Sequence, residues 1–257
     1  MNQASRLLSD PPAYRPGGQW RPIPAVIAVV LMFAIAAAAA VLVGSLADSV
    51  ATGRLDNGAA TETPAAEALP VLVWLTTIQI LLVVLVIVAS GWYGSDRAAT
   101  LALGPPAGGA ASYGAALLSM VVIFGLYTLI VMSLNPETLK QDVRPFADMI
   151  RSDAWWLALI AVGIGAPVSE ELIFRGFLFS ALARSRVGVP GAAVLTTTAW
   201  TSLHAGYSAF GLIEVFAVGL FFSWLLWKTG SLRVPLFCHA AYNTTIILAL
   251  RVIDLPG

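Results

Sequence analysis

Two adjacent glutamates and an arginine interrupt a long apolar stretch of the chain. The stretch APVSEELIFRGFL, residues 166–178, contains Glu170, Glu171 and Arg175. On a helix Glu171 and Arg175, four residues apart, share a face and can form an ion pair. Glu170 is turned about 100° from Glu171 and has apolar residues three and four positions later. Glu170 is therefore either a general base or a buried neutral acid.

The only two histidines of the chain also lie in or at the ends of apolar segments. Trp200 precedes His204 by four residues in WTSLH, and His239 precedes Asn243 by four residues in HAAYN, so each pair shares a helix face. Imidazole and carboxamide can direct N–H donors at one point, as an oxyanion requires. A His–Asn pair alone is more typical of a hydrogen bond between helices. Its combination with Glu170 and a supporting ion pair favours a catalytic site.

Membrane helices are the elements that would position these residues. Of the 257 residues 58% are hydrophobic and only 11% charged, whereas a soluble domain carries about 25% charged residues. Seven apolar runs approach the length that crosses a bilayer, namely 23–47, 69–94, 110–134, 154–183, 190–204, 209–227 and 234–253. The fifth run is short, and the fourth is expected to kink at Pro167. We predict an all-α, polytopic membrane helix bundle with about seven transmembrane helices.

Bringing the motifs together constrains this bundle. Glu170 and His204 each lie about 14 residues from the turn at 184–190, or roughly 21 Å along a helix, whereas His239 lies only about 8 Å beyond Val234. Tilt, the Pro167 kink or a reinserting stretch near residues 204–211 must close this gap. Irregular backbone at such depth is tolerated only where it lines a protein cavity. The sequence therefore predicts a buried, water-accessible cavity around the motifs.

The connections between the runs suggest an orientation. Residues 48–68 form an acidic loop, and residues 135–153 are either an amphipathic segment on the membrane or over a cavity, or a solvated loop with one helical turn. Four apolar residues of the second connection have helical spacing: Leu139, Val143, Phe146 and Ile150. Lysines and arginines on the side of the N-terminus outnumber those on the other side by eight to five. The positive-inside rule then predicts a cytoplasmic N-terminus.

The three motifs together resemble the CPBP family of CAAX proteases and bacteriocin-processing proteins, also called the ABI domain. EELIFR at 170–175 fits the motif EExxxR, and HAAYN at 239–243 fits HxxxN. WTSLH at 200–204 fits FxxxH with Trp200 in place of phenylalanine. Their order and their spacing of roughly 30 residues also fit. The resemblance covers about residues 150–250, and the first three spans carry no motif of the family.

The resemblance implies an intramembrane endopeptidase and a role for each motif residue. Glu170 would activate the attacking water, and His204 would bind that water or shuttle its proton. His239 and Asn243 would form the oxyanion hole over the scissile carbonyl.

Other residues would support the site. Glu171 and Arg175 would position it, and Trp200 would pack beside the histidine. Glu214 fits no motif and either caps the sixth span or lines the mouth of the cavity, with a structural role favoured.

Two glutamates and two histidines could alternatively hold zinc. The sequence contains no HExxH and no pair of histidines on one helical face. Activation of water by a glutamate requires no metal, so we predict a site without metal or other cofactor.

These observations define an expected organisation and function. Residues 1–22 form a cytoplasmic segment, 23–152 variable membrane spans, and 153–257 the catalytic core. We expect a multi-pass protein of a bacterial inner membrane, in contact with lipids, that hydrolyses membrane-associated proteins or peptides. A formal net charge of zero argues against a nucleic-acid partner. The alternatives are a non-catalytic scaffold or bacteriocin-immunity protein, a metal-dependent protease, and a small transporter with a proton relay.

Overall fold

A computed structural model of the chain describes residues 10–51 and 64–252, and these residues contain helices and connections but no strand. The predicted all-α class is thus confirmed for the described residues. Residues 1–9 of the predicted N-terminal segment and residues 52–63 of the predicted acidic loop lie outside the described residues. The helices extend further than expected on both sides of this loop, since α2 (Pro22–Ala51) ends later and α3 (Pro64–Ser90) begins earlier.

Five helical segments are long and apolar enough to cross a membrane: Pro22–Ala47, Leu69–Ser90, Ala111–Leu134, Trp155–Ala183 and Ala209–Thr229. The third corresponds to α5 (Ala111–Leu134) and the last to α11 (Ala209–Thr229). The two other predicted runs also form helices, α10 (Gly188–Ser202) and α12 (Arg233–Val252). With 15 residues, α10 spans roughly 22 Å, less than the ~30 Å hydrocarbon core.

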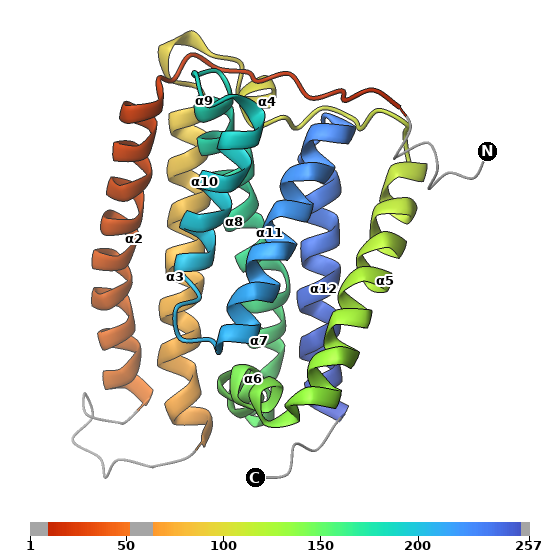
Figure 1. The fold of residues 1–257 in the computed structure, drawn as a ribbon. Coiled ribbons are helices and arrows are strands. Elements are labelled where there is room, and N and C mark those ends of the chain that lie inside the picture. Colours follow the sequence, from red (N-terminus) through yellow and green to blue (C-terminus); the bar gives the residue numbers. More distant parts are fainter. Residues whose placement is uncertain (1–9, 52–63, 253–257) are drawn as a thin grey trace.

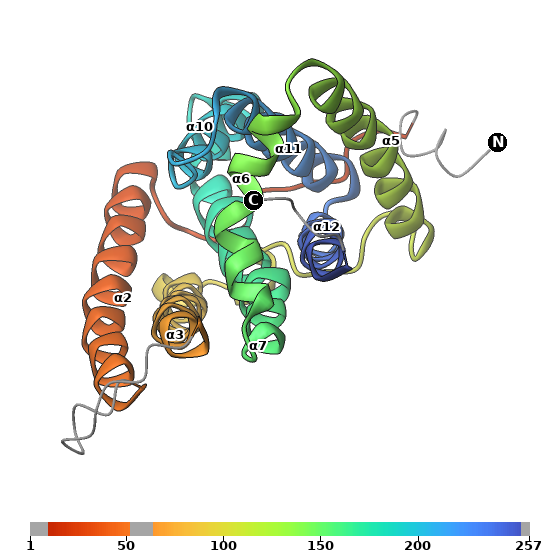
Figure 2. The same cartoon turned by 90° about the horizontal axis from the view of Figure 1, so that it is seen from below.

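The membrane-length helices run side by side, with α10 and α12 among them (Figure 1). A sixteen-residue helix, α6 (Pro136–Arg151), lies across one end of this bundle. Seen from that end, α6 crosses the middle of the molecule, between α3 and α5 (Figure 2). The polar connection at 135–153 is therefore an amphipathic helix, and the alternative of a loop with one helical turn is wrong.

The fourth run contains two π-helical segments. Its α-helical parts are α7 (Trp155–Ile160), α8 (Ala166–Glu170) and α9 (Phe179–Ala183). The π-helical segments η3 (Ala161–Gly165) and η4 (Glu171–Leu178) flank α8. The expected irregularity at Pro167, which lies within α8, is thus spread over both sides of this short helix. Since π-helical turns are rare and concentrate at functional sites, they indicate a functional site at or near α8.

The core and the outer surface have the distribution expected in a bilayer. All eight residues of η4 are buried, and its five large apolar residues belong to one cluster with Phe222 and Leu225 of α11. Large apolar side chains point outward from the bundle instead, such as Ile23 at 74% and Leu42 at 73% exposed on α2. Contiguous exposure of this kind is typical of a surface covered by lipid.

Candidate active site

Glu171 and Arg175 form the predicted ion pair at the start of η4. Arg175 Nη1 donates to Glu171 Oε1 at 3.0 Å, and both side chains are fully buried. The Arg175 guanidinium also lies 4.3 Å from the centre of the Trp200 ring, a cation–π contact. Because a buried charge is costly unless it is paired, each contact helps to keep Arg175 in place.

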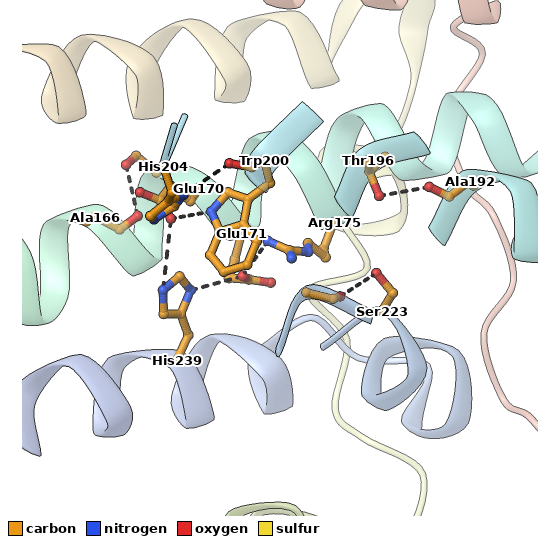
Figure 3. Close-up of polar contacts among 12 residues, drawn as sticks. Ala166, Glu170, Glu171, Arg175, Ala192, Thr196, Trp200, His204, Ser223 and His239 are labelled. Carbon is orange, nitrogen blue, oxygen red and sulfur yellow. Dashed lines mark hydrogen bonds and ion pairs between the residues drawn. The ribbon is translucent and has the colours of Figure 1, made fainter. Parts of the chain in front are cut away.

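Glu171 has a second partner that helix spacing could not reveal. His239 Nδ1 lies 3.0 Å from Glu171 Oε1, and an ionised carboxylate is only an acceptor. The contact therefore assigns the proton to Nδ1 and turns Nε2 of His239 the other way. Nε2 lies 3.9 Å from Oε2 of Glu170, so His239 bridges the two adjacent glutamates (Figure 3).

Glu170 is held by a group from α10. The indole Nε1–H of Trp200 donates to Glu170 Oε2 at 2.5 Å. A phenylalanine, which the family motif has at this position, could not supply this donor. Trp200 is thus more than the packing residue that the sequence predicted, because it orients the carboxylate proposed as the base.

His204 follows the end of α10, next to Glu170 and Trp200 (Figure 3). Its Nδ1 lies 3.1 Å from the backbone oxygen of Trp200, which assigns the proton to Nδ1 and leaves Nε2 as an acceptor. The ring makes edge contacts with Trp200 and Tyr207, at centroid distances of 5.1 and 5.3 Å. These contacts fix the imidazole while Nε2 stays available to a water molecule.

Asn243 lines the same cavity, but one of its N–H groups is engaged. Its Nδ2 donates to the backbone oxygen of Val162 at 2.9 Å. Val162 belongs to η3, so this bond ties α12 to the first π-helical segment. A carboxamide has two N–H donors, and the second remains for the oxyanion role that the resemblance implies.

A cavity of about 440 Å³ joins these residues. Its volume lies in the range of small-ligand sites. The lining includes Glu170, His204, His239 and Asn243, whereas Glu171 and Arg175 lie behind it. The predicted convergence of the motifs is thus achieved at the cavity wall.

Glu214 of α11 also lines this cavity, to which α8 contributes the carboxylate of Glu170. Its Oε1 accepts a hydrogen bond from the Tyr242 hydroxyl at 2.7 Å. The prediction that Glu214 caps the sixth span is wrong, because α11 begins at Ala209 with Ser208 as its N-cap. Glu214 lines the cavity, which was the other alternative.

Among the described residues, no three or more histidine, cysteine, aspartate or glutamate side chains are grouped to hold a metal ion. Nδ1 of His239 is occupied by Glu171, and Nδ1 of His204 by the Trp200 carbonyl. One oxygen of Glu170 is occupied by the Trp200 indole. The Nε2 atoms of both histidines and the other oxygen of Glu170 remain, but the three protein ligands usual in a catalytic zinc site are not grouped in the part of the chain that the structure describes.

Comparison with known proteins finds a family that this part of the chain resembles. Residues 152–245 match the family described as "Type II CAAX prenyl endopeptidase Rce1-like". This range contains all three motifs. It excludes α2, α3, α5 and α6.

Two bacterial relatives match parts of the chain. The "Putative membrane peptidase YdiL" of Bacillus subtilis is 27% identical over 109 residues, which cover 42% of this chain and 43% of the relative. The chain therefore spans less than half the length of that protein. The "UPF0177 protein YxdF" of Lactococcus lactis is 22% identical over 135 residues, or 52% of this chain and 70% of the relative. No solved structure matches.

Proposed function

We propose that the chain is an intramembrane endopeptidase in which Glu170 activates water, and the premise is the match of residues 152–245 to the Rce1-like type II CAAX prenyl endopeptidase family. One observation carries the proposal. Glu170 of α8 faces Trp200 of α10 and His239 of α12 across 2.5 and 3.9 Å, on the wall of one cavity. Three helices far apart in the sequence thus deliver a carboxylate and its partners to one point.

The reaction begins at the carboxylate of Glu170. Glu170 accepts a proton from a water molecule in the cavity while the water oxygen bonds to the carbonyl carbon of the substrate. His204 Nε2, an acceptor in the assigned tautomer, holds this water on its other side. When the C–N bond breaks, Glu170 returns the proton to the leaving amine. Glu170 therefore ends the cycle in its starting state.

His239 and Asn243 stabilise the oxyanion of the tetrahedral intermediate. Since Nδ1 of His239 donates to Glu171, its Nε2 donates as well only in the doubly protonated ring. Such a ring lies between Glu171 at 3.0 Å and Glu170 at 3.9 Å. Arg175 balances the charge of Glu171 from the far side. The second N–H of Asn243 provides the other donor.

We further propose that α10 and α12 lie within the membrane with the five membrane-length helices, which gives seven transmembrane helices. The N-terminus is then cytoplasmic in a bacterial inner membrane, as the distribution of lysine and arginine favours. The substrate is a membrane-associated protein or peptide. Since a bacterium need not prenylate its proteins, the proposal does not extend to prenylated CAAX substrates.

Two substitutions in the same cavity test the base. Glu170→Gln is expected to lower kcat for membrane-proximal peptides by about 10²–10⁴-fold, the usual contribution of a general base. Glu214→Gln removes the carboxylate that α11 contributes to the same cavity, and it is expected to lower kcat far less. Both proteins are purified in detergent, and peptide products are identified by mass spectrometry. Equal losses in the two variants would contradict the assignment of Glu170.

Three alternatives predict different results for the same two proteins, wild type and Glu170→Gln, in cleavage and in one further measurement each. For a non-catalytic scaffold or immunity protein, wild type and Glu170→Gln would cleave nothing and give equal phenotypes in cells. For a metal-dependent protease, purified protein would contain stoichiometric zinc and lose turnover on chelation. For a proton-relay transporter, wild type would cleave nothing, and Glu170→Gln would abolish uptake coupled to protons.

A further inference from the structure

Helix α6 forms one wall of the candidate active-site cavity, although it lies outside the family domain. Its apolar residues Leu139, Val143 and Phe146 line the cavity together with Glu170 and His204. Positions 139, 143 and 146 share one helix face. Asp142 lies on the same face and also lines the cavity. A carboxylate on the apolar face of an amphipathic helix requires an explanation.

Asp142 is buried, with 9% of its surface exposed, and both of its oxygens bind one residue. Oδ1 accepts the backbone N–H of Ser208 at 2.7 Å, and Oδ2 accepts the Ser208 hydroxyl at 2.6 Å. The Ser208 hydroxyl in turn accepts the backbone N–H of Gly211 at 3.0 Å. Asp142 thus completes the N-terminal cap of α11, where a negative charge is favoured by the helix dipole.

The fit at this contact is close. A Cβ atom on Gly211 would lie 2.3 Å from Asp142 Oδ2, so any side chain at 211 would displace the carboxylate. Helix α11 therefore approaches α6 as nearly as a backbone without a side chain allows. We call the contact of Asp142 with Ser208 and Gly211 the α6–α11 clasp.

The clasp fixes the far end of the short connection that carries His204. This connection, residues 203–208, joins α10 to α11. Tyr207 immediately precedes Ser208, packs its ring on the His204 imidazole at 5.3 Å, and donates its backbone N–H to the His204 carbonyl at 2.9 Å. Burial, followed by the charges of Glu170, Asp142 and Glu214, raises the pKa of Tyr207. Tyr207 therefore remains a neutral phenol among these carboxylates.

We propose that Asp142 is a positioning residue of the active site, which acts through Ser208 and Tyr207 to hold His204 on the cavity wall. The inference depends on the proposed function for its catalytic consequence, and it adds a residue of α6 that the family domain does not contain. Asp142 does not take part in the chemistry. Its loss lets the 203–208 connection move, and a misplacement of about 1 Å at a catalytic group can cost about 10²-fold in rate.

The test compares substitutions on both sides of the clasp with one elsewhere on α6. Asp142→Ala is expected to lower kcat by at least about tenfold and to change KM far less. Asp142→Asn keeps one acceptor oxygen for the Ser208 N–H and an amide that can donate to the hydroxyl, so it should recover part of kcat. Glu137→Gln is the matched control, because Glu137 is an exposed carboxylate of the same helix. It should behave as wild type.

A double-mutant cycle assigns the effect to the clasp. Since Asp142 acts through Ser208, the double variant Asp142→Ala/Ser208→Ala should be little worse than the Asp142 variant alone in kcat. The same non-additivity is expected in the thermal unfolding midpoint, which requires no substrate. Asp142→Asn serves in both measurements if Asp142→Ala does not fold.

Several results would overturn the inference. The inference is wrong if the effects of Asp142→Ala and Ser208→Ala are strictly additive, or if the kcat of Asp142→Ala equals that of Glu137→Gln. It is also wrong if Asp142→Ala raises KM at constant kcat, because Asp142 would then be a substrate-binding residue. If wild type cleaves no peptide, the proposed function and the catalytic role of Asp142 both fall. The unfolding midpoints would still show whether the clasp itself exists.

Discussion

Trp200 combines contacts that no other aromatic residue could supply in full. Its indole N–H binds Glu170 at 2.5 Å, and its ring covers Arg175 at 4.3 Å. Trp200→Phe keeps the ring and loses the donor, so we expect kcat to fall by about tenfold, in line with a hydrogen bond to a charged group. Trp200→Ala also leaves a cavity beside a buried cation, and should cost about 3–5 kcal/mol of stability. Activity assays and thermal unfolding of both variants check this. Equal unfolding midpoints would contradict the packing role.

For single residues, spacing in the sequence predicted only contacts within one helix. The pairing of Glu171 with Arg175 follows from their separation of four residues, and the structure confirms it. The partners of Glu170 lie 30 and 69 residues away in the sequence, at Trp200 and His239. Which nitrogen of His239 faces which glutamate depends on how the helices rotate against each other. No periodicity within a single helix encodes that rotation.

At the scale of helices, a glycine sets how closely α11 approaches the buried ion pair. A Cβ on Gly219 would lie 2.7 Å from Thr197 Cγ2 and 2.9 Å from Arg175 Nη2. Gly219→Ala should therefore destabilise the protein by about 1–3 kcal/mol through overpacking. On α5, a Cβ on Gly125 would meet nothing within 4 Å, so Gly125→Ala should be neutral or stabilising by its helix propensity. Thermal unfolding should thus show a lower midpoint for Gly219→Ala and an unchanged or higher midpoint for Gly125→Ala. Shifts of the same sign and size would refute the close approach.

Hydropathy predicted the position of the helices better than their internal geometry. The run expected at 110–134 became Ala111–Leu134, and the run expected at 209–227 became Ala209–Thr229. Long apolar stretches determine such ends because the bilayer has a fixed thickness. The π-helical segments on both sides of α8 were not predicted, and only Pro167 indicated an irregularity there. A π-helical turn changes the hydrogen-bond register without a characteristic composition, so hydropathy does not detect it.

For the whole molecule, the basic residues concentrate at the end opposite α6. Seven of the described lysines and arginines lie at the end of α4 (Arg97–Thr100) and α9: Arg15, Arg21, Arg97, Arg184, Arg186, Lys228 and Arg233. Four lie toward α6 and the end of α12: Lys140, Arg144, Arg151 and Arg251. The positive-inside rule predicts that the first end is cytoplasmic. In the proposed orientation the wall that α6 forms, and the cavity beneath it, would belong to the outer side of the membrane.

Labelling of single cysteines tests this orientation. In a Cys238→Ala background, Glu137→Cys on α6 should react with a membrane-impermeant maleimide in intact cells. Arg186→Cys, in the turn between α9 and α10, should react only after the membrane is permeabilised. Both positions are exposed, so the difference would report sidedness and not burial. The reverse pattern would place the cavity on the cytoplasmic side, and the substrate would then have to be sought among cytoplasmic segments of membrane proteins.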